Sequence, residues 1–133
     1  MPKAVARRRE GYTHEVEVDG HTVVADEPGS AGGADLGPSP TRLLAAALAS
    51  CTAITMEMYA ERKGWDLGAL EVEVEMEYGK PSVPSSFEVI LKLPSSLSDE
   101  QHDKLKAIAG RCPVHRVITH EVEVTITDRV ELV

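Results

Sequence analysis

The sequence predicts an α+β fold in which antiparallel sheets pack around one long, buried central helix. Segments that alternate apolar and charged residues, typical of strands with one wet face, lie before and after an apolar helical run at residues 42–58. This order differs from the regular alternation of strand and helix in a doubly wound parallel sheet. With 133 residues, 42% of them hydrophobic, the chain is expected to form a single domain over residues 1–133.

The N-terminal region is predicted to form an antiparallel hairpin. In the segment THEVEVDGHTVVAD, Val16 and Val18 precede an Asp-Gly dipeptide and Val23 follows it. Asp-Gly favours the tight turn that joins two antiparallel strands. The segment KAVARRR, residues 3–9, indicates a further short strand before them, and the Gly- and Pro-rich residues 27–40 indicate a loop after them.

The loop leads into the central helix. Ser39 is suited to cap the helix through its hydroxyl, and Pro40 is suited to the first helical position. Residues 43–55 carry no charge on any side, so this part is expected to be buried all round, and Gly64 is expected to end the helix.

The second half of the chain returns to strands and then to helices. The segment LEVEVEMEYG alternates apolar residues with glutamates, and PSVPSS then interrupts the chain. After a further strand, FEVILKL, the segment PSSLSDEQHDKLKAIAGR has acidic residues early and lysines later, as in a capped amphipathic helix. The predicted elements are strands at residues 70–79, 87–93 and 120–133, a helix within residues 94–111, and a short helix opened by Pro113.

Charge and composition argue against nucleic acid and membrane as partners. The 14 Lys and Arg against 22 Asp and Glu give a net charge of -8, which repels phosphate backbones and anionic lipid. Aromatic residues, at 4%, are too few for a base-stacking surface. The N-terminus lacks an apolar stretch, and the apolar run at residues 43–54 is short and rich in Ala, Ser and Thr. We therefore expect a cytoplasmic protein.

The chain has only two cysteines, and each allows two interpretations. In a reducing compartment a transient redox disulfide is more plausible for the pair than a permanent one. Cys51 can be a small apolar filler of the helix or a reactive thiol. Cys112 precedes Pro113, which places it at a helix N-terminus where free N–H groups, with Arg111 and Arg116 nearby, stabilise a thiolate. A simple capping role is the alternative.

A zinc site is a competing interpretation of the same residues. Cys112 and His115 share one helix face, and Cys51 could be a third ligand. Structural zinc sites use four ligands and usually contain close pairs of cysteines, which this chain lacks. No phosphate-binding or dinucleotide-binding glycine motif is present either. We therefore expect neither a metal nor a cofactor.

The buried helix also indicates a partner. A lone chain of this size has difficulty enclosing a helix on all sides, so a second copy is expected to cover part of it. The sequence therefore predicts an obligate homodimer.

With both cysteines placed, the segments DEPGSAGGADLGPSPTRLLAAALASCTAITMEMYAERKG and RCPVHRVI closely resemble the OsmC/Ohr family, the osmotically inducible and organic hydroperoxide resistance proteins. The resemblance implies an OsmC-like fold, an intertwined homodimer and peroxiredoxin-type chemistry against oxidative stress. Cys51 would reduce an organic hydroperoxide and become a sulfenic acid, and Cys112 would condense with it to a disulfide. A dithiol reductant, a lipoylated protein in the better-known branch, would reopen that disulfide.

The chain departs from this family at the helix entry. Organic hydroperoxide resistance members use a strand arginine, held by a glutamate at the helix entry, to activate the first cysteine, and here Thr41 or Arg42 occupies the glutamate position. Arg42 is about 13.5 Å along the helix from Cys51 and on its opposite side. The candidates for the strand arginine are Arg7, Arg8 and Arg9. The missing glutamate favours an alternative function, a small-molecule binding or redox-sensing protein with little peroxidase activity.

Overall fold

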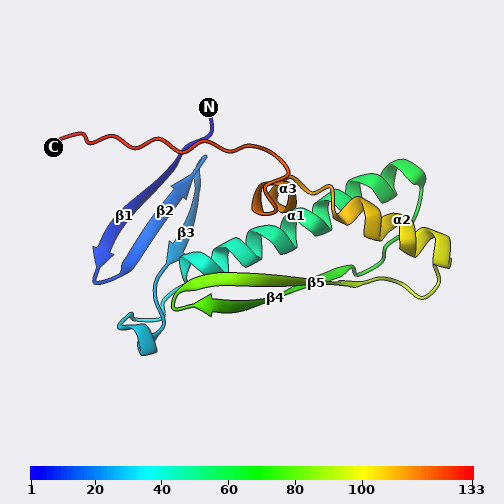
Figure 1. Cartoon of the computed structure of the whole chain (residues 1–133), viewed down its shortest axis with the longest axis horizontal. Helices are drawn as coiled ribbons and strands as arrows, with labels where there is room; N and C mark the ends of the chain where they lie inside the picture. The colour runs from blue at the N-terminus through cyan, green and yellow to red at the C-terminus, as the bar shows by residue number, and fades with distance from the viewer. The chain divides into compact units, whose positions relative to one another are not determined.

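The structure is a computed structural model that describes all residues, 1–133. Three strands come first, followed by a long helix, two further strands and two shorter helices (Figure 1). The chain divides into two compact units, which we call unit 1 (Met1–Ala46 and Met76–Phe87) and unit 2 (Ala47–Glu75 and Glu88–Val133). The long helix and the second pair of strands contribute residues to both units. The predicted α+β class is confirmed.

Unit 1 contains a three-stranded antiparallel sheet in the order β1-β2-β3, formed by β1 (Ala4–Glu10), β2 (Thr13–Val18) and β3 (His21–Ala25). The turn between β2 and β3 consists of Asp19 and Gly20, whose φ angles are 47° and 84°. Two successive residues in the left-handed region define the hairpin turn that Asp-Gly favours. The predicted hairpin and the short strand before it are confirmed.

The interior of unit 1 is organised by one buried carboxylate. Asp26, 2% exposed, accepts hydrogen bonds from the Thr13 hydroxyl at 2.7 Å and from the N–H groups of Glu27 and Leu36 at 2.7 and 3.2 Å. The Thr13 hydrogen bond is the main cause that lowers the pKa of this carboxyl below its ordinary value. These contacts fold the predicted loop, which contains one 3-10 turn at Gly29–Ala31, back onto the sheet.

The long helix α1 (Pro40–Lys63) begins and ends as expected. The Ser39 hydroxyl accepts the N–H of Arg42 at 3.4 Å, which satisfies one of the free donors of the first turn. Gly64, with φ 73°, ends the helix in the left-handed conformation. The helix buries a single stripe, in which successive members are four residues apart: Leu48, Thr52, Met56 and Ala60.

The expectation that residues 43–55 are buried on every side is wrong for the single chain. Leu44 and Ile54 remain 40% and 55% exposed. The absence of charge predicted burial, but only one stripe of the helix finds apolar neighbours within this chain.

The next two strands, β4 (Glu71–Lys80) and β5 (Val83–Lys92), form a two-stranded sheet. The predicted interruption over residues 81–86 is shorter than expected, because β5 already begins at Val83. Ser82 provides the turn with a φ of 66°. Along the first part of β4 the apolar side chains are half-buried and the glutamates are exposed, as the alternation predicts.

Unit 2 has the apolar core of the chain. Helix α2 (Asp99–Ala109) starts in a capping box, in which Ser98 and Gln101 each accept a backbone N–H from the other residue. A short helix, α3 (Pro113–Ile118), follows. The buried core consists of Met56, Ala60, Leu67, Leu105 and Ala109.

By length and composition alone, α1 is compatible with a membrane span. The core helix of a globular domain passes the same test, and α1 contributes Met56 and Ala60 to the core of unit 2 together with α2.

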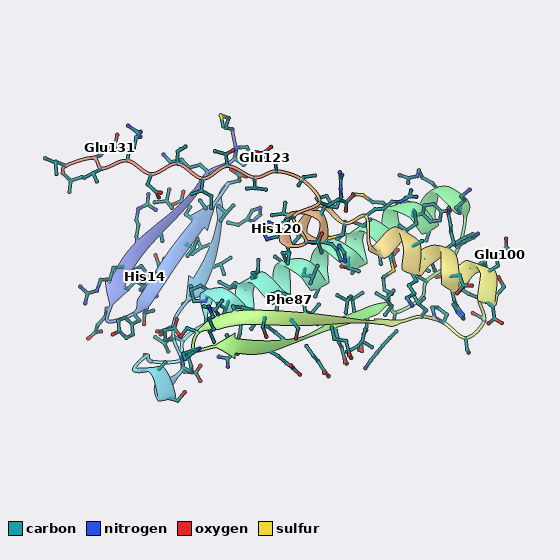
Figure 2. All side chains as sticks on the ribbon, viewed as in Figure 1. His14, Phe87, Glu100, His120, Glu123 and Glu131 are labelled. Atoms are coloured by element: carbon teal, nitrogen blue, oxygen red, sulfur yellow. The ribbon has the colours of Figure 1, made fainter.

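The predicted C-terminal strand is not observed. Residues 121–133 contain neither strand nor helix, and Figure 2 labels Glu123 and Glu131 on this segment. The apolar side chains of the alternation are exposed; Val124, Ile126, Val130 and Leu132 are 55%, 81%, 86% and 94% exposed. The alternating pattern correctly describes a strand with two different faces, but a strand forms only where a neighbouring strand pairs with it. No strand of this chain does so.

Candidate redox-active cysteine pair

The structure places the two cysteines side by side within unit 2. Cys51 lies in the middle of α1 and is half-buried, whereas Cys112 is fully buried at the start of α3, and neither forms a disulfide. The Cys51 thiol is within hydrogen-bonding reach of the Cys112 sulfur, and this contact raises the pKa of Cys112. The two thiols are therefore neighbours in the folded chain.

Local sequence fixes the position of Cys112. Pro113 occupies the first turn of α3, and Cys112 is the N-cap residue, with φ -55° and ψ 132°. Its sulfur accepts the N–H of His115 at 3.4 Å, and its own N–H donates to the carbonyl of Ala109 at 3.3 Å. The capping role and the thiol role are therefore compatible, because the same contacts hold the sulfur in place.

The expected stabilisation of a Cys112 thiolate is wrong. Burial raises the pKa of Cys112, Cys51 adds to this effect, and the N–H of His115 and the hydroxyl of Thr52 oppose it only in part. Arg111 and Arg116 are exposed, and the Arg116 Nε atom pairs with the Glu121 carboxylate at 3.3 Å. Because desolvation outweighs the helix N-terminus, Cys112 keeps its proton at neutral pH.

A pocket of about 610 Å³ lies within unit 2. Thr52 and His115 line it. Thr52 follows Cys51 in the sequence, and the N–H of His115 donates to the Cys112 sulfur. The Thr52 Oγ1 and His115 Nδ1 atoms are buried; His115 Nδ1 has no hydrogen-bond partner, and the Thr52 hydroxyl has only a weak interaction with the Cys112 thiol. The complete lining consists of Thr52, Val89, Leu91, Leu93, His102, Asp103, Lys106, Ala109, Gly110 and His115.

Sequence reasoning did not identify this pocket. In the sequence, Thr52 lies in an uncharged helical run, and the pattern around His115 suggests only a zinc ligand. The available signal was a hydroxyl on the stripe of α1 that is otherwise apolar, next to Cys51. No group of three or more His, Cys, Asp or Glu side chains is arranged to hold a metal ion in this structure.

The arginines that could activate Cys51 have other partners. Within the sheet of unit 1, Arg7 Nη1 pairs with Glu17 Oε2 at 2.8 Å, and Arg9 Nη1 pairs with Glu15 Oε1 at 3.3 Å. Arg8 donates to a backbone carbonyl of the β1–β2 turn at 3.0 Å. The three arginine side chains are exposed, so these contacts are those of a solvated sheet surface.

The protein combines a small α+β fold with two adjacent free thiols, one of them at a helix N-terminus. This arrangement places it in the class of proteins with a paired-cysteine site. The sequence pattern of the family described as OsmC-like protein matches residues 32–127. The chain therefore belongs to the OsmC-like family, as its motifs indicated. A comparison with curated proteins finds no match.

Solved structures agree with this fold. A putative osmotic stress induced and detoxification response protein from Psychrobacter arcticus superimposes with a TM-score of 0.81 at 22% identity, over 88% of each chain. An OsmC-like protein from Mycoplasma pneumoniae gives 0.76 at 18% identity, over 90% of this chain and 87% of that one. An organic hydroperoxide resistance protein OsmC from Legionella pneumophila, described as a predicted redox protein, gives 0.61 at 22% identity, over 87% and 88%.

Proposed function

We propose that this protein is a thiol-dependent peroxidase that reduces organic hydroperoxides, with Cys51 as the peroxidatic and Cys112 as the resolving cysteine. The observation that supports the proposal best is the contact between a half-buried Cys51 and a buried Cys112. Only the half-buried thiol is accessible to a peroxide from outside. Three neighbours in structure, from Legionella pneumophila, Vibrio cholerae and Elizabethkingia anophelis, are described as organic hydroperoxide resistance proteins, one of the three as putative.

In the first step the Cys51 thiolate attacks the terminal oxygen of the hydroperoxide. The O–O bond breaks, an S–O bond forms, and the released alkoxide takes a proton to become the alcohol. Cys51 becomes a sulfenic acid and loses two electrons, which the peroxide gains.

In the second step the Cys112 sulfur attacks the Cys51 sulfenic acid. The S–S bond forms while the S–OH bond breaks, and hydroxide leaves as water with the proton of Cys112. Because the thiolate is the attacking form, the proton that burial retains on Cys112 leaves its sulfur during the attack and goes to the departing hydroxyl. A dithiol, such as that of a lipoylated protein, then returns two electrons and two protons and is itself oxidised to a disulfide.

Titration of free thiols tests this cycle. One equivalent of cumene hydroperoxide should remove two thiols per chain from the reduced protein, and dithiothreitol should restore both. Cys51→Ser should abolish peroxide consumption. Cys112→Ser should still consume one equivalent and should end as a sulfenic or over-oxidised Cys51, detected by intact mass. Equal single-turnover rates for the wild type and Cys51→Ser would reject the proposal.

We also propose that the active form is a homodimer. The exposed apolar side of α1, with Leu44, Ile54 and Met58, and the unpaired alternating segment 121–133 are two surfaces that a second copy would cover. Sedimentation in dilute buffer should give a dimer, and Ile54→Arg should shift it to monomer. A stable, folded wild-type monomer would contradict this.

The alternative, a binding or redox-sensing protein, is favoured by the pocket beside the cysteines and by the absent helix-entry glutamate. Slow reaction with cumene hydroperoxide, together with an intact pocket that retains a copurifying ligand, would select this alternative.

A further inference from the structure

Three cationic side chains of unit 2 gather around the aromatic ring of Tyr59. The Arg62 Cζ, Lys63 Nζ and Lys104 Nζ atoms lie 6.0, 5.7 and 5.9 Å from its centroid. The ring of Trp65 contacts the same tyrosine edge-on, with the two centroids 5.6 Å apart. We call these five residues the Tyr59 cluster.

The chemistry of the helix end explains only part of this cluster. Arg62 and Lys63 lie in the last turn of α1, where cations stabilise a helix C-terminus. Lys104 belongs to α2, and it lies at the same ring although like charges repel one another. None of the three exposed cations forms an ion pair. Positive charge is therefore left without a counter-ion on a chain whose net charge is -8.

The aromatic residues give the cluster the composition of a protein-binding surface. The chain has one Trp, three Tyr and one Phe, so two of its five aromatic residues meet here. Both rings are half-buried, and both line a pocket of about 800 Å³ together with Lys63 and Lys104. Trp, Tyr and Arg are the residues that most often dominate the free energy of binding between proteins.

Two carboxylates in the same pocket decide which kind of anion fits. Glu100, labelled in Figure 2, and Asp103 are exposed on α2, and neither forms an ion pair with the lysines of the pocket. A nucleic acid carries a charge on every nucleotide, so these carboxylates and the net charge of the chain repel it. A peptide segment can place its acidic side chains beside the cations and uncharged ones beside the carboxylates.

From this arrangement we infer that the Tyr59 cluster is a docking surface for an acidic segment of a partner protein. Acidic side chains of the segment pair with the three cations, and an apolar side chain lies against the rings of Tyr59 and Trp65. Salt weakens such an interaction because its charged groups are exposed. The binding involves neither cysteine, so it is independent of the proposed peroxidase cycle.

The fluorescence of Trp65, the only tryptophan of the chain, can report this binding directly. Addition of an oligoglutamate peptide that contains one leucine should change the emission saturably, and the affinity should fall as the salt concentration rises. An oligolysine peptide of the same length, also with one leucine, should cause no saturable change. The absence of saturable binding by the acidic peptide, or equal binding of the two peptides, would overturn the inference.

Charge variants locate the binding on the surface. Lys63→Gln/Lys104→Gln should weaken the binding of the oligoglutamate peptide at least about threefold, because two exposed ion pairs are lost. Lys104→Arg keeps the charge and should bind like the wild type. The matched control Lys106→Gln removes one charge from α2 outside the cluster and should have no effect, whereas Lys104→Gln should weaken binding. Equal affinities of Lys104→Gln and Lys106→Gln would show that only net charge matters and would reject the docking surface.

Two other occupants of the cluster would give different results. If a second copy of this chain covers it, Lys63→Gln/Lys104→Gln should change the sedimentation of the protein without any peptide. If a lipid surface covers it, phosphatidylglycerol vesicles should bind in a manner that depends on the two lysines, and the peptide should not bind. Either result would overturn the inference. An unchanged sedimentation profile, with peptide binding that depends on Lys104, would support it.

Discussion

The two units bury their polar groups in opposite ways. In unit 1 the buried Asp26 accepts three hydrogen bonds, from the Thr13 hydroxyl and from two backbone N–H groups. In unit 2 the buried His115 Nδ1 atom has no hydrogen-bond partner, and the buried Thr52 hydroxyl has only a weak one, the Cys112 thiol. A satisfied polar group is typical of structural positions, whereas an unsatisfied one requires another explanation. The difference is consistent with our proposal that the functional site lies in unit 2, which also contains both cysteines.

The units also differ in apolar burial. Ala25 is the one buried hydrophobic residue found in unit 1, whereas unit 2 has a cluster that includes Met56 and Leu105, both 0% exposed. We therefore expect the stability of unit 1 to depend on polar contacts and that of unit 2 to depend on packing. The following predictions test this contrast, beginning with the largest effect.

Leu105→Ala should lower the free energy of unfolding by about 2–5 kcal/mol, because it leaves a cavity in the core of unit 2. Urea denaturation followed by circular dichroism measures the change. The exposed Val83→Ala should change stability by no more than about 0.5 kcal/mol. Similar losses for both variants would show that the cluster is not the main source of stability.

Asp26 should make the protein less stable as the pH falls. Its folded pKa is lowered, mainly by Thr13, so its contribution is complete above the unfolded pKa near 3.8 and is lost as pH falls through the folded value. Asp26→Asn should therefore be less stable at neutral pH and should lose less stability on acidification. Thermal unfolding between pH 7 and pH 2.5 measures both effects. The exposed Asp128→Asn should behave like the wild type.

Cys112 should make the protein less stable at high pH, whereas Asp26 makes it less stable at low pH. Its folded pKa is raised by burial, so its contribution is complete below the ordinary pKa of 9.0 and is lost as pH rises through the folded value. Under reducing conditions the unfolding midpoint of the wild type should fall as pH rises beyond 9, and Cys112→Ala should show a smaller decline. Cys51→Ala should keep most of the decline, because burial is the largest cause of the raised pKa and Cys51 adds a smaller part. An equal decline in both variants would contradict the assignment.

The smallest effect is expected for Thr52→Val. Removal of a buried hydroxyl that has no partner stronger than the Cys112 thiol should change the free energy of unfolding by less than about 1 kcal/mol, or increase it. Thr13→Val makes the same chemical change at a satisfied position and should destabilise the protein, because Asp26 loses its hydroxyl donor. Equal losses of stability for Thr52→Val and Thr13→Val would contradict the contrast between the two units.

Most elements could be predicted because their signals are local. Asp19-Gly20 specifies a tight turn, Ser39 and Ser98 specify helix starts, and Gly64 specifies a helix end, and each depends only on nearby backbone. The C-terminal strand was predicted incorrectly for the opposite reason. Its alternating pattern is real, but pairing depends on a neighbour that the pattern does not identify.

The candidate site was only partly predictable. The position of Cys112 at a helix N-terminus follows from Pro113, whereas its raised pKa follows from burial by distant residues. The sequence therefore indicated a thiolate that the structure does not favour. The pocket likewise depends on residues from α1, β5, α2 and α3, and no local pattern combines Thr52 with His115.

The order of the strands in unit 1 has a consequence for synthesis on the ribosome. Strands β1, β2 and β3 each pair with their immediate neighbour through short turns, so they can assemble as soon as they emerge. Cys51 meets Cys112 only after most of the polypeptide has been made. We therefore expect the nascent chain to carry a solitary thiol for much of translation, and to become able to cross-link itself only when synthesis is nearly complete.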